Sequence, residues 1–220
     1  MMANLRAIAF DCDGVLVDSE SLSAVCLNAM MAERGVLRDV PYFLDLLRGR
    51  RVAEWIREIF GLFDLDEDPA RFEADYRRLV YRRYPIELQA EPGVHELLEG
   101  ITAPRIVVSN APLRKIELGL SVTKVDRYFE REPVSAYELQ SWKPDPEIYR
   151  HAAAQLGYPP RECIAVEDSH AGLRAATAAG FYTVAYWRGR EPDNEVRRSA
   201  DRVVDGHEQL DSLVRSLLRD

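Results

Sequence analysis

Residues 7–14 read Ala-Ile-Ala-Phe-Asp-Cys-Asp-Gly, an apolar run that ends abruptly in two aspartates. A short, uninterrupted apolar run is typical of a strand buried on both faces of a parallel sheet. Side chains alternate along a strand, so the carboxylates of Asp11 and Asp13 should lie on the same side of its end, and Gly14 permits a sharp turn after them. Two such carboxylates repel each other unless a divalent cation such as Mg²⁺, a shared proton or open solvent accompanies them. For this segment alone, a solvated turn remains the alternative.

The composition is that of a globular protein able to bury a sizeable core, with 220 residues, 47% hydrophobic and 30% charged. A net charge of -8 argues against a nucleic-acid partner or an anionic membrane surface. The three cysteines show no paired spacing, so neither a zinc site nor a disulfide framework is expected. We also find no signal-peptide pattern and no apolar stretch of membrane-spanning length, and we therefore expect a cytoplasmic protein without a membrane partner.

The segment from residue 18 to residue 87 shows only helical periodicity. We expect helices that run from residue 18 to Gly35, over 42–47, from 52 until Gly61 stops the helix, and from Asp68-Pro69 until Pro85 stops the helix. This pattern predicts a small α-helical domain at 18–87, inserted into a core formed by residues 1–17 and 88–220.

The rest of the chain alternates between strands and helices. Strands are expected over 7–10, 105–108, 163–166, 182–187 and 203–204, and helices over 94–100, 113–120, 146–156, 170–179 and 207–218. This alternation predicts an α/β core with a Rossmann-like parallel sheet and helices on both of its faces.

Three of the apolar strands end in polar side chains, and in open α/β sheets ligands bind beyond the carboxyl ends of the strands. The three groups should therefore meet in one crevice: Asp11 with Asp13, Ser109 with Asn110, and Glu167 with Asp168. Lys143 lies in the rigid loop Trp-Lys-Pro-Asp-Pro at 142–146. Taken singly, Ser109 could cap the next helix, Lys143 could be a solvated loop charge, and the Glu167-Asp168 pair could be an exposed turn.

Together these groups could transfer a phosphoryl group through an aspartyl-phosphate. Asp11 would attack phosphorus, Mg²⁺ and Lys143 would neutralise the phosphoryl oxygens, and Ser109 with the N–H of Asn110 would bind the group that moves. Asp13 could protonate the leaving oxygen and then deprotonate the attacking water.

The remaining candidates concern the metal and the substrate. Asp168 would bind the metal directly, and Glu167 either directly or through water. The basic stretch from Arg48 to Arg51 could be a solvated loop, or Arg48 could contact a second anionic group of the substrate.

Four motifs occur in an order that resembles the haloacid dehalogenase superfamily. They are Asp-Cys-Asp-Gly-Val-Leu-Val-Asp (11–18), Val-Val-Ser-Asn (107–110), Trp-Lys-Pro-Asp-Pro (142–146) and Val-Glu-Asp-Ser-His-Ala-Gly (166–172). Within the superfamily the chain resembles the β-phosphoglucomutase-like phosphatases with a helical cap, and two of its segments resemble bacterial 6-phosphogluconate phosphatases.

This resemblance implies a role for each matching residue. By similarity, Asp11 is the nucleophile, Asp13 the acid–base group and a metal ligand through its main-chain carbonyl, Ser109 the phosphate binder, Lys143 the charge neutraliser and Asp168 a metal ligand. The resemblance also implies that residues 18–87 form an α-helical cap, which closes over the substrate and excludes water, and that residues 1–17 and 88–220 form the catalytic core.

The resemblance also separates competing functions. Sugar-phosphate mutases carry a histidine in the first cap helix where this chain has Ser23, so hydrolysis is favoured and the mutase is the alternative. Dehalogenases lack the second aspartate, so Asp13 argues against that activity. A phosphorylatable receiver domain is a further alternative, because it also combines acidic residues, a serine and a lysine. The order of these groups along this chain differs from that of a receiver, so this alternative is disfavoured. The expected function is a monomeric, Mg²⁺-dependent phosphatase that acts on a small sugar phosphate or sugar acid phosphate.

Overall fold

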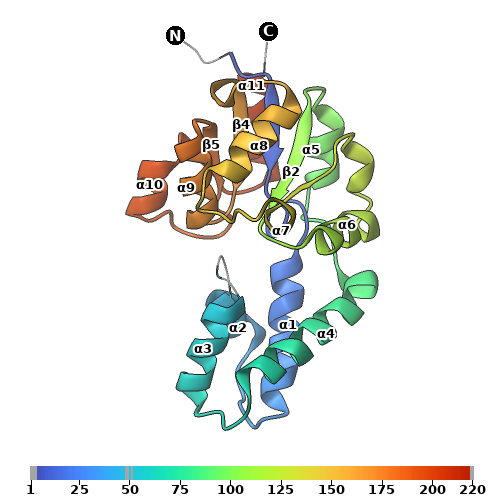
Figure 1. Cartoon of the computed structure of the whole chain (residues 1–220), viewed down its shortest axis with the longest axis vertical. Coiled ribbons are helices and arrows are strands. Elements are labelled where there is room, and N and C mark those ends of the chain that lie inside the picture. The colour runs from blue at the N-terminus through green and yellow to red at the C-terminus, as the bar shows by residue number, and fades with distance from the viewer. Residues whose placement is uncertain (1–3, 48–49, 51, 219–220) are drawn as a thin grey trace. The chain divides into compact units, whose positions relative to one another are not determined.

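A computed structural model of the chain describes residues 4–47, 50 and 52–218 (Figure 1). These residues divide into two compact units, one formed by the residues before 18 and after 89, the other by residues 18–89. In the first unit, Val17 and Ala90 pair as an antiparallel bridge. The chain therefore leaves the first unit and returns to it at the same place.

Among the described residues of the first unit, six strands form one parallel sheet. They are β1 (Ala7–Phe10), β2 (Arg105–Ser109), β3 (Val134–Ser135), β4 (Cys163–Glu167), β5 (Tyr182–Tyr186) and β6 (Arg202–Val204). The spatial order is β3-β2-β1-β4-β5-β6, and every neighbouring pair is parallel. The connections change direction between β1 and β4, which is the place where such sheets bind ligands. The predicted Rossmann-like sheet is confirmed, although the two-residue strand β3 escaped prediction.

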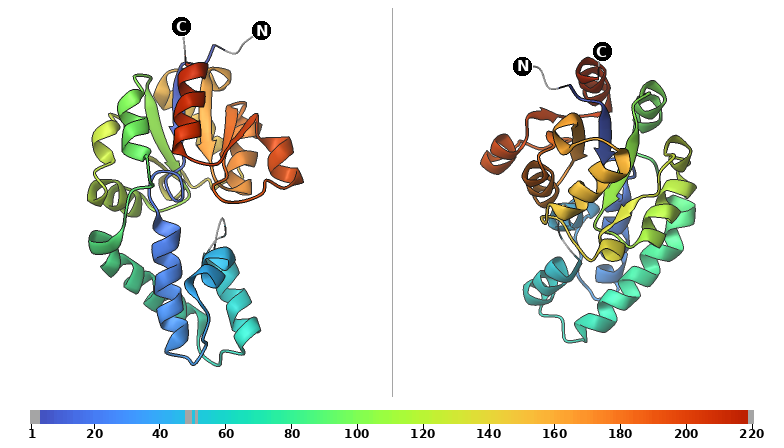
Figure 2. Two further views of the ribbon diagram at one scale, coloured as in Figure 1. Left: turned by 180° about the vertical axis from the view of Figure 1, so that it is seen from behind. Right: turned by 45° about the horizontal axis from the view of Figure 1, so that its top comes forward.

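Helices cover both faces of this sheet, as Figures 1 and 2 show with α8 on one face and α11 on the other. The helices of this unit are α5 (Val94–Gly100), α6 (Leu113–Val122), α7 (Ala136–Leu139), α8 (Glu147–Leu156), α9 (His170–Ala179), α10 (Asn194–Ser199) and α11 (His207–Leu217). Ala7 and Ala9 of β1 belong to a buried cluster with Ala152 and Leu156 of α8. Small residues on the strand let this helix lie close to the sheet.

The described residues of the second unit form four helices and no strand. These are α1 (Ser19–Ala32), α2 (Val40–Leu47), α3 (Val52–Phe63) and α4 (Pro69–Glu87). Asp68 caps α4 by accepting a hydrogen bond from the N–H of Ala70 at 3.0 Å, with Pro69 at the first helical position. Aromatic contacts between α3 and α4, such as Trp55 with Tyr76 at 4.9 Å, fill the core of this unit.

Two helices of this unit continue past the residues that were predicted to stop them. Helix α3 does not stop at Gly61 but runs to Phe63, because burial of its apolar face outweighs the roughly 1 kcal/mol that a helical glycine costs. Helix α4 continues past Pro85 to Glu87. A proline so near the helix end removes only one backbone donor, and the fully buried Tyr84 holds this turn in place.

No helix in the described part of the chain is long and apolar enough to cross a membrane.

Candidate active site

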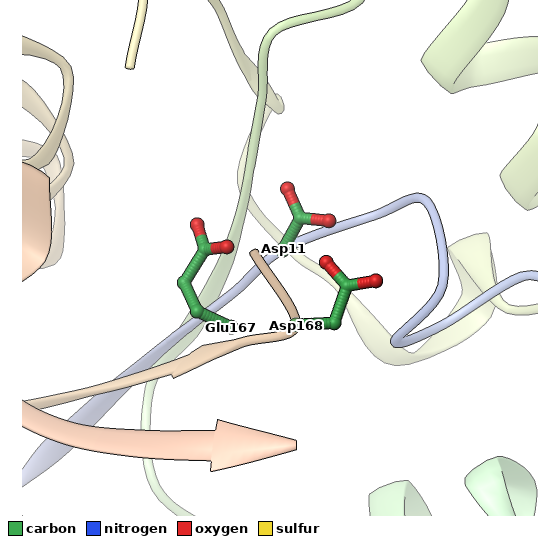
Figure 3. Close-up of side chains that lie close together, drawn as sticks. All are labelled: Asp11, Glu167 and Asp168. Carbon is green, nitrogen blue, oxygen red and sulfur yellow. The ribbon is translucent and has the colours of Figure 1, made fainter. Parts of the chain in front are cut away.

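Three carboxylates meet where β1 and β4 end. Asp11 directly follows β1, Glu167 is the last residue of β4, and Asp168 follows it. The two strands are neighbours, and the N–H of Asp11 donates to the carbonyl of Val166 at 2.9 Å. Figure 3 shows the three side chains turned toward one another, and one oxygen from each lies within 4.8 Å of the others. The predicted convergence of Asp11 with the Glu167-Asp168 pair is therefore present.

Lys143 reaches this cluster from the loop before α8, and its side chain is buried. Its ammonium has three protons and three acceptors, which are Asp11 Oδ1 at 2.5 Å, Glu167 Oε1 at 2.5 Å and the carbonyl of Val108 at 2.9 Å. The amine therefore links the two carboxylates to the end of β2, and it is held in one place.

Asn110 fixes the backbone of the lysine loop. Its Oδ1 accepts a hydrogen bond from the N–H of Lys143 at 2.8 Å, and its Nδ2 donates to the carbonyl of Lys143 at 3.3 Å. The sequence had suggested a contribution of the Asn110 main chain to phosphate binding, but it gave no sign of this side-chain clamp.

Glu167 lies in a closed socket and is fully buried. Its Oε1 accepts from Lys143 and from the hydroxyl of Tyr149, and its Oε2 accepts from the hydroxyl of Ser169 at 3.3 Å. A Cβ atom added at Gly172 would lie 1.9 Å from Oε2, so no side chain fits at residue 172 while Glu167 keeps this position. Tyr149 and Gly172 were missed as site residues, although Gly172 does close the fourth sequence motif.

Asp13 is paired with a lysine that the sequence analysis also missed. Lys115, in the first turn of α6, places its Nζ 2.9 and 3.0 Å from the two carboxylate oxygens of Asp13. The side chain of Asp13 does not belong to the three-carboxylate group found among the described residues. Two carboxylates of the first motif thus each have a lysine partner.

Ser109 and Arg48 were also predicted as substrate-binding residues. Ser109 is buried at the end of β2, and its hydroxyl oxygen accepts from the N–H of Ala111 at 3.1 Å, so its own proton remains available for another acceptor. Arg48 lies outside the described residues. Its described neighbour Arg50 pairs with Glu58 at 2.5 Å.

Burial dominates the electrostatics of the site. It raises the pKa of Asp11 to about 8, with Lys143 opposing the shift and Glu167 adding to it. Burial lowers the pKa of Lys143, but the charges of Asp11 and Glu167 outweigh this, and the pKa lies above its usual value. The carboxylates of Asp11, Glu167 and Asp168 each offer an oxygen close enough to share one ion. Carboxylate oxygens at this spacing fit a hard divalent cation.

A buried histidine supports the loop that carries Asp13. The carbonyl of Val15 can only accept, so Nε2 of His207 donates to it at 3.0 Å, and Nδ1 accepts from the hydroxyl of Tyr186 at 2.8 Å. The pKa of His207 is lowered to about 4, chiefly by burial and also by the charge of Arg188, although the hydrogen bond to Val15 opposes this shift. His207 is therefore neutral near pH 7, in the tautomer that both partners require.

Comparisons with known proteins agree with this geometry. A protein-family model described as haloacid dehalogenase-like hydrolase matches residues 5–180. The 6-phosphogluconate phosphatase of Escherichia coli K12 is 36% identical over 184 residues, which are 82% of this chain and 81% of that protein. The phosphorylated carbohydrates phosphatase of Thermotoga maritima is 29% identical over 183 residues, covering 80% and 82% of the two chains.

A solved structure extends the likeness to three dimensions. The crystal structure of a haloacid dehalogenase family hydrolase from Deinococcus radiodurans, with bound phosphate and sodium, superposes with a TM-score of 0.82. The sequence identity is 26%, and the match covers 98% of this chain and 97% of that one. The predicted resemblance is confirmed by these matches. The chain is a hydrolase and belongs to the haloacid dehalogenase-like hydrolase family.

Proposed function

We propose that the protein is a Mg²⁺-dependent phosphatase that hydrolyses a small sugar phosphate or sugar acid phosphate through an aspartyl-phosphate on Asp11. The observation that carries this proposal is the contact of Lys143 with Asp11 inside a buried group of three carboxylates. The names of the two curated relatives support the substrate class. In the same proposal the enzyme is a monomer, and it is cytoplasmic, a reducing compartment with which its three free cysteines agree.

In the first step, an oxygen of Asp11 attacks phosphorus and the bond from phosphorus to the leaving oxygen breaks. Asp13 gives its proton to that oxygen, so that an alcohol leaves. The hydroxyl of Ser109 and the N–H of Asn110 bind the phosphoryl oxygens, and the fixed ammonium of Lys143 lowers the repulsion between them and Asp11.

In the second step, Asp13 is a carboxylate and takes a proton from a water molecule as the water oxygen attacks phosphorus. The bond between phosphorus and Asp11 breaks, and inorganic phosphate is released. Asp13 is then protonated again and ready for the next substrate.

A divalent metal would be held by the carboxylates of Asp11 and Asp168 and by the main-chain oxygen of Asp13. Glu167 would contact it through water, because both of its oxygens already accept hydrogen bonds. When bound, Mg²⁺ would supply positive charge to the phosphoryl oxygens as they approach Asp11.

The helical unit of residues 18–89 is proposed to be the cap that excludes water from the reaction. Its basic loop, with Arg48, is proposed to contact the part of the substrate that does not react. Ser23 on α1 stands where mutases of the family carry a histidine, which favours hydrolysis over the mutase alternative.

The test is phosphate release from a panel of phosphorylated sugars, sugar acids and short-chain acids, after the metal has been removed with EDTA. We expect Mg²⁺ to restore turnover, Asp11→Asn to abolish it, and Asp13→Asn to retain label from a radioactive aryl phosphate ester on Asp11, because an aryl leaving group needs no proton from Asp13. Turnover that persists in Asp11→Asn, or that needs no metal, would contradict the mechanism. Conversion between sugar phosphate isomers without phosphate release, given a bisphosphorylated sugar, would favour the mutase.

A further inference from the structure

Lysine is rare in this chain, and its placement is informative. Of the 29 lysines and arginines, only Lys115, Lys124 and Lys143 are lysine. Two of the three contact the aspartates of the first motif: Lys143 binds Asp11, and Lys115 binds Asp13. An ammonium is a compact charge whose donors surround one atom, whereas a guanidinium is a planar fork that needs more room. The chain therefore has the compact cation at both places where a first-motif carboxylate is paired.

The pair of Lys115 and Asp13 is symmetrical. The Nζ atom is nearly equidistant from the two carboxylate oxygens, at 2.9 and 3.0 Å. Helix α6 holds the lysine, and the first-turn N–H of Lys115 donates to the carbonyl of Pro112 at 2.9 Å. The aspartate is held from the other side by the turn at Gly14, whose φ of 80° is in the left-handed region. Two elements separated by 102 residues thus fix one carboxylate.

This contact contributes little to folding. The two side chains are 24% and 29% exposed, and ion pairs that water can reach stabilise a protein only slightly. Its larger consequence is orientation. When Asp13 carries the proton that it donates, its other oxygen can still accept from Lys115, and this contact limits rotation of the carboxyl group. The partial exposure also leaves the pair accessible to a substrate.

We propose that Lys115 is the positioning residue for Asp13, which it orients toward the leaving oxygen of the substrate. This inference rests on the proposed function, in which Asp13 protonates that oxygen. It also narrows the substrate class, because such positioning matters only when the leaving group is a poor one. A sugar hydroxyl leaves as a strongly basic alkoxide unless it is protonated, whereas a nitrophenol leaves readily without a proton.

The experiment compares two classes of ester in three variants. The substrates are the alkyl phosphate that the unmodified protein hydrolyses best and p-nitrophenyl phosphate. The variants are Lys115→Met, Asp13→Asn and the matched control Lys124→Met, whose lysine is exposed and lies outside the site. The quantity measured is kcat/KM, because it reports the steps up to the first phosphoryl transfer and excludes hydrolysis of the intermediate.

We expect Lys115→Met to lower kcat/KM by about 10- to 100-fold for the alkyl ester and by less than about threefold for the aryl ester. Asp13→Asn should show the same selectivity to a greater degree, and Lys124→Met should match the unmodified protein. Equal losses on both esters, or no loss, would overturn the inference. If Lys115→Met does not fold, as judged by circular dichroism, Lys115→Gln replaces it under the same criterion.

The two proposals fail in different ways. If the unmodified protein releases phosphate from neither ester, the proposed function is wrong and the role of Lys115 falls with it. If the unmodified protein is active and the ratio of the two kcat/KM values is unchanged in Lys115→Met, only the role of Lys115 is wrong.

Discussion

Replacing Gly172 by alanine tests the tight packing of residue 172 against the buried carboxylate of Glu167. The added methyl group would lie 1.9 Å from Oε2 of Glu167 and 2.0 Å from its carboxyl carbon. Nonbonded carbon and oxygen atoms need roughly 3 Å or more, so the carboxylate would have to move by about 1 Å or the helix would have to shift. Either movement separates Glu167 from Lys143 and Tyr149.

The expected loss of stability follows from the contacts of Glu167 that this movement breaks. A hydrogen bond to a charged group contributes about 1.5–3 kcal/mol, and a buried charge that loses its partner costs about 3–5 kcal/mol. Replacing a helical glycine by alanine stabilises the helix by about 1 kcal/mol, which offsets part of this loss. We therefore expect Gly172→Ala to lower the free energy of unfolding by about 2–4 kcal/mol and to lower kcat, because Lys143 loses one of its three acceptors.

Gly61 offers a matched control in the interior of α3, where a Cβ atom would find nothing within 4 Å. Gly61→Ala should raise the free energy of unfolding by about 0.5–1 kcal/mol and leave phosphate release unchanged. The assays are urea denaturation followed by circular dichroism, and phosphate release at saturating substrate. If Gly172→Ala were as stable and as active as the unmodified protein, the tight packing of residue 172 against Glu167 would be refuted.

Two further changes test the contacts around the site. Tyr149→Phe keeps the ring but removes one hydrogen-bond donor to the buried Glu167. We expect the free energy of unfolding, measured by urea denaturation, to fall by about 1–2 kcal/mol and kcat to fall at least about threefold. Unchanged values would show that the hydroxyl is dispensable. The pKa of His207 is about 4 in the folded protein and about 6.5 in the unfolded chain. Between these pH values the unfolded chain binds more protons than the folded protein. The free energy of unfolding should therefore fall by up to about 3 kcal/mol as the pH drops from 6.5 to 4. His207→Gln should flatten this slope in urea titrations, and an unaltered slope would show that His207 is not its source.

The sheet and the meeting of its strand ends could be predicted because the relevant information is local. A polar residue directly after a buried apolar strand is visible in the sequence, and parallel strands bring their carboxyl ends to one edge. Asp11 and Asp168 were placed together on this reasoning alone. The strand β3 was missed because two residues leave no periodic pattern.

The missed site residues depend on contacts between distant segments. Lys115 and Tyr149 lie within ordinary helical patterns, and their partners are 102 and 18 residues away. Gly61 and Pro85 show the converse, since their strong local signals for a helix end were overridden by packing of the helical unit. Local chemistry thus predicted which groups end the strands, while the groups that hold them in place required the fold.

The three contacts of the Lys143 ammonium limit the role that this residue can have in the proposed reaction. All three of its protons already have acceptors, and two of these are buried carboxylates that cannot lose a cation without a large cost. The neutral carbonyl of Val108 is the weakest acceptor of the three, so a contact with a phosphoryl oxygen would most readily replace that one. In the proposed reaction, Lys143 therefore keeps Asp11 and Glu167 in place while its charge acts on the incoming phosphoryl group, and the position of β2 relative to the lysine loop determines how close that charge can come.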